Sequence, residues 1–301
     1  MKITLLIVIL TLGCNGAFAG SLIETFGSGA NQFSMEFVEI GNPNNAPDTY
    51  GKGSVSYVYN IGKYEVSRDM VDKANSQANL GITYIPSLSD TPTKPATGIT
   101  WVEAAKFVNY LNTSTGGTAA YKFSGNTFQL WSSSDSGYDS SNLFRNSLSK
   151  FVLPNENEWV KAAYGGPDGT WNLYPTGNST PTSVTSGTLL NTAVYRQDAV
   201  ADVNNAGALS RYGTMAQGGN VFEAIENAVD GSNNLTNEDR MTRGGSIYES
   251  VPYLSSGYYF GLRPTSTGGD FGLRVVSVPE PSALSLFAIG LGGLALVRRR
   301  K

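Results

Sequence analysis

Hydrophobic and polar positions along this chain follow a regular period in only a few short segments. Three runs have strand signals, at residues 34–40, 55–61 and 271–276. Between them lie two long polar stretches, 113–149 and 164–212, which are rich in Gly, Ser, Thr and Asn. Loops of this length need an organising core or bound ions. The pattern predicts a single α+β domain with much irregular loop structure.

Helix signals are few, but they are well formed. A capping box opens one helix at Thr100, whose hydroxyl and the carboxylate of Glu103 can satisfy each other's end donors. An apolar stripe at helical spacing follows it, formed by Trp101, Ala104, Ala105, Val108 and Leu111. A second helix is predicted to start at Asn155, with Glu158 three positions later. A third, weaker signal begins at Ser67.

The N-terminus has the pattern of a segment that is removed on export. Lys2 precedes an apolar run over residues 3–12, and Ala17 and Ala19 form a small-x-small cleavage site. We expect residues 1–19 to be a signal peptide that signal peptidase removes. A buried N-terminal strand is one alternative, and lipidation at Cys14 is another, because the residues before it loosely resemble a lipoprotein cleavage site.

The C-terminus carries a second processing pattern. An uncharged apolar segment, 283–297, would form a helix of about 22 Å. This is short of the ~30 Å hydrocarbon core of a membrane. Basic residues follow it and would stay in the cytoplasm; they are Arg298, Arg299, Arg300 and Lys301. Both ends therefore predict a body outside the cytoplasm.

The tail as a whole resembles the PEP-CTERM sorting signal of bacteria that produce exopolysaccharides. The triplet Pro279, Glu280 and Pro281 is followed by the short apolar segment and by the arginines 298–300. The resemblance covers residues 278–301 and implies recognition by an exosortase, cleavage near the triplet, and transfer to the cell surface or extracellular matrix. The alternative is an ordinary single-span membrane anchor.

Charge and composition exclude several function classes. The whole chain has a net charge of −3, but residues 20–281 keep all 24 acidic and only 16 of the 21 basic residues, which gives −8. A body this acidic does not suit nucleic acid as a partner. The chain has no histidine, and its single cysteine, Cys14, lies in the predicted signal peptide. Disulfides, histidine-dependent catalysis and the usual zinc sites are therefore not expected in the mature body.

Several short motifs along the body occur in an order that resembles the sulfatase-modifying factor family, whose founding members are formylglycine-generating enzymes. The motifs are Phe37–Gly41, Ile61–Ser67, Ile99–Ala105, Leu153–Trp159, Gly219–Glu223, Arg243–Ser246 and Phe271–Arg274. The resemblance covers about 33–276, within a predicted domain at 20–277. It implies a variant of the C-type lectin fold, with structural roles for Trp101, Trp159 and Arg243.

The resemblance does not extend to the family's oxidative chemistry. Active formylglycine-generating enzymes bind copper through two cysteines near the end of the domain. Counted back from Arg263, the matching positions are Ser255 and Phe260, and neither side chain can replace a thiolate. Another branch of the family binds iron through histidines, which this chain lacks. We therefore expect no copper, iron or zinc and no family-type catalysis.

Calcium is the one family cofactor that the residues could still hold. The resemblance implies a site formed by the carbonyl groups of Gly219 and Val221 and the carboxylate of Glu223, and a second site at Asn191. The alternative is that Glu223 only hydrogen-bonds a loop. The Asp230–Asp239 stretch is spaced loosely like a calcium loop, but without the turn glycine and the closing glutamate it is better explained as a solvated loop.

The resemblance also implies that the region before the last strand lines a cleft. The candidates for ligand contact are Ser255, Tyr258, Tyr259, Phe260 and Arg263. Tyrosine-rich surfaces suit peptides and sugars. The alternative is that these rings only fill the cleft, above all Phe260.

The main functional hypothesis is an exported, surface-sorted, non-catalytic domain that binds a peptide, glycan or matrix polymer. One alternative is an enzyme with an unrecognised carboxylate or tyrosine site, including a glycosidase-type carboxylate pair. The other is a purely structural matrix protein.

Overall fold

A computed structural model describes residues 21–279. The predicted signal peptide, the apolar C-terminal segment and the sorting residues Glu280, Pro281, Arg298, Arg299 and Arg300 lie outside this range. Within it, no helix is long and apolar enough to cross a membrane.

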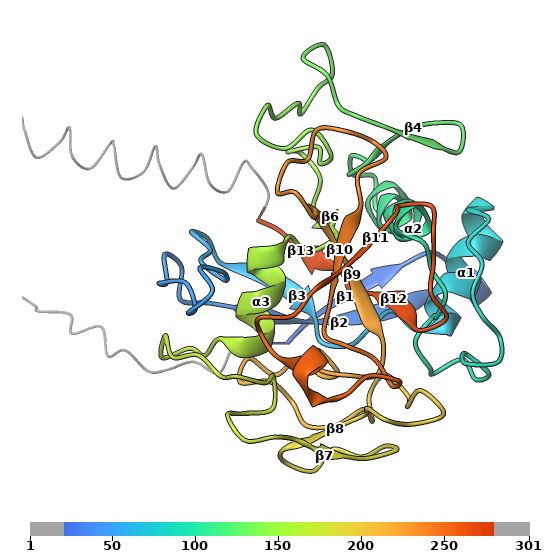
Figure 1. Cartoon of the computed structure of the whole chain (residues 1–301). Coiled ribbons are helices and arrows are strands. Elements are labelled where there is room, and N and C mark those ends of the chain that lie inside the picture. The colour runs from blue at the N-terminus through green and yellow to red at the C-terminus, as the bar shows by residue number, and fades with distance from the viewer. Residues whose placement is uncertain (1–20, 280–301) are drawn as a thin grey trace, which may run out of the picture.

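The body is built on two small sheets, which Figure 1 shows next to one another. The first sheet has five strands, and all its pairs are antiparallel. In spatial order these are β1 (Leu22–Phe26), β2 (Phe33–Ile40), β3 (Tyr59–Gly62), β13 (Val276–Ser277) and β6 (Phe151–Val152). The last strand of the chain therefore lies between β3 and β6, which closes the domain on itself.

The second sheet has four strands and brings together the parts of the chain that carry the candidate site. In spatial order they are β11 (Phe260–Leu262), β10 (Arg240–Arg243), β9 (Phe222–Ala228) and β12 (Phe271–Leu273). Strands β9 and β12 are parallel, and the other pairs are antiparallel. The long loops contain two further strand pairs, β4 (Lys122–Ser124) with β5 (Thr127–Gln129) and β7 (Thr182–Ser183) with β8 (Thr192–Ala193).

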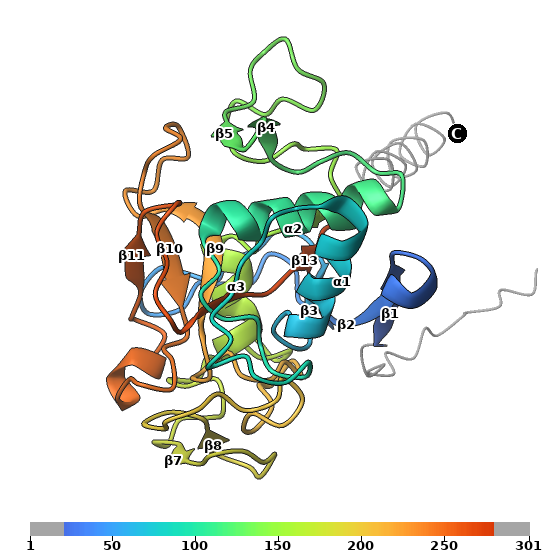
Figure 2. The same ribbon diagram turned by 90° about the vertical axis from the view of Figure 1, so that its right-hand side faces the viewer.

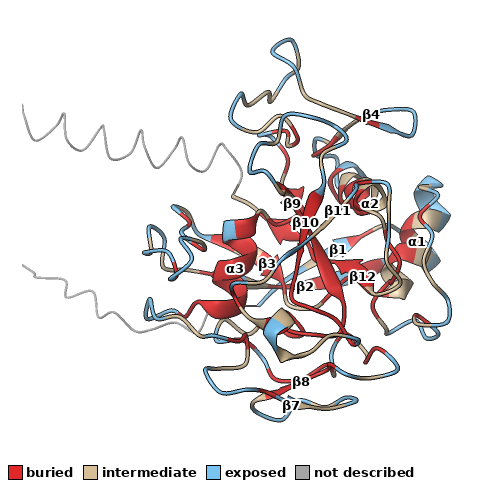
Figure 3. Ribbon diagram, in the orientation of Figure 1, coloured by how far each residue is buried: buried red, intermediate tan, exposed pale blue. Residues whose placement is uncertain are grey.

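The three helices begin where the sequence predicts. They are α1 (Arg68–Ala78), α2 (Trp101–Ser114) and α3 (Glu156–Tyr164). Ser67 caps α1, the predicted capping box of Thr100 with Glu103 is present, and Asn155 forms a second capping box with Glu158. All five residues of the predicted stripe on α2 are at most 4% exposed. Figure 2 shows α1 beside α2, and Figure 3 shows the buried face of α2 turned to the protein interior.

Two of the predicted strands differ from the structure. The run 271–276 is not one strand but two, because the chain leaves the four-stranded sheet after Leu273 and joins the five-stranded sheet at Val276. Arg274 lies at this crossing and is fully buried. The run 55–61 becomes a strand only at Tyr59, since the carbonyl of Val55 instead accepts a hydrogen bond from Asn44 in a loop.

Candidate functional site

The parallel pairing of β9 with β12 places an ion pair in the centre of the domain. In the register, Glu223 lies opposite Gly272, which is two residues before Arg274. The side chains of Glu223 and Arg274 are both fully buried. Arg274 donates to Glu223 from Nε, at 3.0 and 3.1 Å, and from one terminal nitrogen at 2.6 Å. Trp159 donates its ring N–H to the same carboxylate at 2.6 Å. Both oxygens of Glu223 are therefore hydrogen-bonded within the protein.

A second carboxylate lies beside this pair. Glu65 accepts hydrogen bonds from Asn220 Nδ2 at 2.6 Å and from the backbone N–H of Val221 at 3.3 Å. Complete burial, and secondly the charge of Glu223, raise the pKa of Glu65 well above its ordinary value. The positive charge of Arg274 acts in the opposite direction and partly offsets this rise in pKa.

This geometry bears on the predicted calcium site. Glu223 is occupied by a cation, Arg274, which a calcium ion would have to displace. Asn191 donates to Thr180 O at 3.1 Å, while its side-chain oxygen is buried without a partner. Across residues 21–279, no three Cys, Asp or Glu side chains are grouped as a metal site would require. The arrangement at Glu223 fits the hydrogen-bonding alternative, and calcium there stays a prediction that this geometry does not support.

Gly219, the glycine of the predicted calcium site, is needed for a close backbone approach. Its φ is +96°, and a Cβ at this position would lie 2.3 Å from the carbonyl oxygen of Val194. Gly219 therefore lets the loop pass close to the end of β8, where the backbone N–H of Asn220 donates to Val194 O at 2.8 Å.

A second buried charge group positions the predicted ligand loop. Arg243, at the end of β10, pairs with Glu156, which also pairs with Lys52 at 2.6 Å. One terminal nitrogen of Arg243 donates to the carbonyl groups of Ser256 at 2.7 Å and Tyr258 at 2.9 Å. Because these bonds come from a buried cation, they fix the path of residues 256–258.

Four of the five cleft candidates lie within residues 255–260, from this loop to the first residue of β11, and they do not all face the same environment. The hydroxyl of Ser255 donates to Pro252 O at 2.7 Å, at the end of a short 3-10 helix. The ring of Tyr258 packs against Tyr253 at 4.3 Å between centroids. Tyr259 and Phe260 are exposed by 44% and 42%.

The ring of Phe260 packs against other aromatic rings on its inner side, although its outer side is exposed to solvent. Its ring lies 6.2 Å from Phe222 and 6.0 Å from Phe271, both of which are buried. The predicted filling role therefore describes one face of this ring only.

The sequence analysis did not identify Tyr50, which lies on the same surface although it is far from this loop along the chain. Tyr50 is 56% exposed, and its ring covers Gly257, where a Cβ would lie 2.7 Å from it. Among residues 21–279, four aromatic side chains are exposed, and three of them, Tyr50, Tyr259 and Phe260, are on or against residues 257–260. The fourth is Tyr248. No local pattern around Tyr50 could have revealed this contact.

Arg263 lies beyond this surface, at the edge of a cavity of about 280 Å³. The other residues of its lining come from α2, the β4–β5 hairpin, the loop before β10 and the two residues after Arg263. They are Val102, Asn126, Thr127, Phe128, Thr236, Asn237, Pro264 and Thr265. Arg263 thus lines a different part of the surface from the aromatic residues that precede it.

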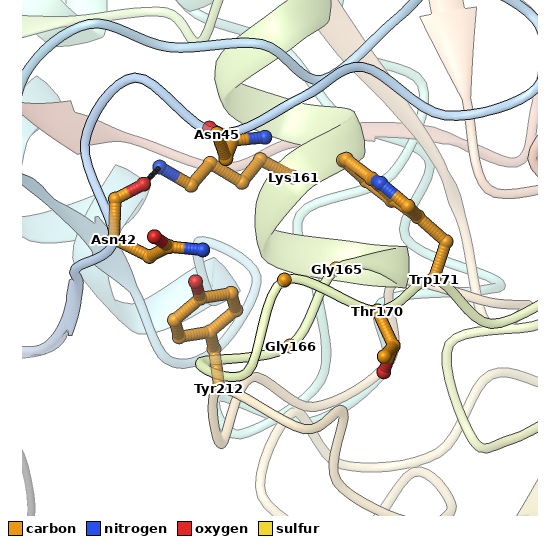
Figure 4. A pocket seen from close by; sticks show the side chains of 9 residues that line it. Asn42, Asn45, Lys161, Gly165, Gly166, Thr170, Trp171 and Tyr212 are labelled. Atoms are coloured by element: carbon orange, nitrogen blue, oxygen red, sulfur yellow. Dashed lines mark hydrogen bonds between the residues drawn. The ribbon is translucent and has the colours of Figure 1, made fainter.

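A further group that the sequence analysis missed is Lys161, which lies in the crevice of Figure 4. It is 1% exposed, and its ammonium donates to the carbonyl of Asn42 at 2.9 Å. None of the ion pairs within residues 21–279 includes it. Burial lowers its pKa to about 8. In this position Lys161 fixes the turn after β2.

Comparison with known protein families agrees with the order of motifs and with this architecture. Residues 33–278 match the family model described as the sulfatase-modifying factor enzyme 1-like domain. The chain belongs to this family. Residues 277–301 match the PEP-CTERM protein-sorting motif, which implies export, surface sorting and processing by an exosortase. A comparison with curated proteins finds no match.

Several solved structures share the fold at low sequence identity. Variable protein 1 of Treponema denticola has a TM-score of 0.55 at 17% identity, covering 86% of this chain and 99% of its own. CarF has a TM-score of 0.59 at 17% identity, over 81% of this chain and 98% of its own. PvdO from Pseudomonas aeruginosa has a TM-score of 0.55 at 14% identity, over 85% and 98%. These similarities confirm the predicted α+β fold of the formylglycine-generating enzyme type.

The family tryptophans and arginine serve the fold. Trp101 donates to the carbonyl of Ile225 at 3.0 Å, Trp159 donates to Glu223, and Arg243 holds the 256–258 loop. The structural roles that the resemblance implied for these three side chains agree with their hydrogen bonds.

Proposed function

We propose that this family member is an exported, surface-sorted, non-catalytic protein that binds a peptide, glycan or matrix polymer on an aromatic surface. We define the aromatic surface as Tyr50, Tyr259 and Phe260. The observation that carries the proposal is that three of the four exposed aromatic side chains of residues 21–279 lie on or against one loop.

The rigidity of this loop supports a binding role. Arg243 fixes its carbonyl groups, and Phe222 and Phe271 support the ring of Phe260. Aromatic side chains held in one position lose little conformational freedom on binding, so more of the contact energy contributes to affinity.

The residues at the family's copper positions support a non-catalytic role. Ser255 uses its hydroxyl to donate to Pro252 O, and Phe260 offers only a ring. Neither is a ligand for copper. The sorting motif supports a site of action at the cell surface or in the extracellular matrix.

The test is a binding measurement on the full chain, purified in detergent. Fluorescently labelled extracellular polysaccharide and surface protein from the producing cells are titrated separately, and anisotropy is recorded. We expect saturable binding to one of them, weakened about 5- to 30-fold in Tyr259→Ala and in Phe260→Ala, which corresponds to about 1–2 kcal/mol.

The matched control is Ile23→Ala on β1. Ile23 is 66% exposed, and Figure 2 shows β1 and β11 on opposite sides of the domain. Binding should be unchanged in this variant. Absence of saturable binding by the wild-type chain, or an equal loss in Ile23→Ala, would contradict the proposal.

A further inference from the structure

The cavity beside Arg263 has features of a separate ligand site. Its wall combines four distant segments, which contribute Val102 from α2, residues 126–128, residues 236–237 and residues 263–265. At about 280 Å³ it lies at the lower end of small-molecule pockets, which begin at roughly 300 Å³. This size suits one ring of a ligand and not a folded segment of a partner.

The lining of the cavity carries one charge, and this charge is positive, although the body is acidic. Arg263 is the one charged residue of its lining. Within residues 21–279, its guanidinium takes part in none of the ion pairs, and it is exposed. Lys106 donates to Asn126 Oδ1 at 2.9 Å, which places a second cation behind the rim.

Two carboxylates are adjacent along the chain to residues of this wall, Glu103 and Glu238. The side chain of Glu238 is largely buried and forms its ion pair with Arg240, at 3.8 Å. Glu103 follows Val102, but one of its oxygens accepts from Thr83 and the other accepts from Thr100. The backbone N–H of Val102 already donates to Pro264 O at 3.0 Å. An anion in the cavity would therefore be held by Arg263, and not by the start of the helix. A guanidinium offers paired donors that match a carboxylate.

The rest of the lining matches the two kinds of surface on a sugar ring. The uncharged polar groups can hydrogen-bond hydroxyls; they are the amides of Asn126 and Asn237 and the hydroxyls of Thr127, Thr236 and Thr265. The apolar groups, Val102, Phe128 and Pro264, can contact the C–H face of a ring. A peptide would instead need backbone partners over several residues, and the neighbouring edge strand β11 has only three.

We propose that this cavity binds one acidic sugar unit of a polysaccharide, with the sugar carboxylate on Arg263 and the ring against Val102 and Pro264. The inference rests on the proposed binding function, because it names the class of ligand. It uses residues other than the aromatic surface, so the two proposals can fail separately.

The test titrates the full chain in detergent with a fluorescently labelled tetraglucuronate, and with neutral cellotetraose of the same length. We expect saturable binding of tetraglucuronate and at least tenfold weaker binding of cellotetraose. In Arg263→Ala, the binding of tetraglucuronate should weaken at least tenfold, while Arg263→Lys should keep part of it because it retains the charge without the paired donors.

Arg196→Ala is the matched control. Arg196 is exposed and, within residues 21–279, takes part in none of the ion pairs, and it does not line the cavity. Its replacement removes the same charge and should leave the titration unchanged. Thermal midpoints of both variants should stay close to that of the wild type, because both side chains are exposed.

Three results would overturn the inference: no saturable binding of tetraglucuronate, equal binding in Arg263→Ala, or tighter binding of a labelled tetraglutamate peptide than of tetraglucuronate. If Arg263→Ala binds tetraglucuronate normally while Tyr259→Ala loses binding of its polymer, the result supports the aromatic surface and contradicts the sugar site. The reverse pattern would support the sugar site and contradict the aromatic surface.

Discussion

The ion pair between Arg274 and Glu223 allows a sharp test of how the centre of the domain is held together. In Arg274→Met, the guanidinium is lost from a place where it satisfies Glu223 and the carbonyl groups of Gly62 and Met215. Removal of one partner of a buried pair costs about 3–5 kcal/mol. The two carbonyl groups add about 1 kcal/mol each. The expected loss, about 5–7 kcal/mol, approaches the whole stability of an ordinary domain, about 5–15 kcal/mol.

The second variant removes the other charge. Glu223→Gln keeps the shape of the side chain and is expected to cost about 1.5–3 kcal/mol, the range for a hydrogen bond to a charged group. In the double variant no charge of the pair is left buried, so the expected cost falls to about 2–4 kcal/mol. The double variant should therefore be more stable than Arg274→Met alone.

The assay is urea unfolding followed by circular dichroism on the full chain, in calcium and again in chelator. Arg211→Met is the control, because its partner Asp168 is 55% exposed and the loss of stability should be much smaller than in Arg274→Met. If Arg274→Met does not fold, the comparison is whether the double variant does fold, as the reasoning predicts. The reasoning is refuted if the two losses simply add, or if chelator alone destabilises the wild type by several kcal/mol, since calcium would then be the counter-charge of Glu223.

Three further predictions concern single positions. Burial lowers the pKa of Lys161 from 10.5 to about 8 in the folded protein, so the unfolded chain binds more protons between these two values and the thermal midpoint should rise with pH across this window. The variant Lys161→Met should not show this rise. A wild-type midpoint that falls with pH in this window would contradict the burial argument. Gly219→Ala should cost more than about 2 kcal/mol in urea unfolding, since its φ is positive and a Cβ would meet the carbonyl of Val194, whereas Gly41→Ala, with open space around it, should cost far less. Asn155→Ala removes the cap of α3 and should cost about 1 kcal/mol in the same assay; a neutral effect would show that the cap is dispensable.

Much of the local structure could be predicted because it depends on neighbouring residues. The caps at Thr100 and Asn155 satisfy the first N–H groups of their own helices, so the starts of α2 and α3 follow from short sequence segments. The apolar stripe on α2 has the helical period whatever it packs against. The order of the motifs also predicted the family and its fold.

The candidate site could be predicted only in part. Ser255, Tyr258, Tyr259 and Phe260 lie on one loop because they are neighbours in the chain. Tyr50 joins them from about two hundred positions away, through a contact with Gly257 that only the packed fold creates.

The sequence by itself determined that no histidine is present and that residues 21–279 contain no cysteine, and no fold can supply these side chains. It also determined the C-terminal sorting motif and the helix starts, which depend on short segments of the chain. The tertiary structure alone decided the division of 271–276 between two sheets, the pairing of Glu223 with Arg274 and the burial of Lys161. The physical reason is that a buried charge needs a partner in space, and the partner can come from any part of the chain that packs against it.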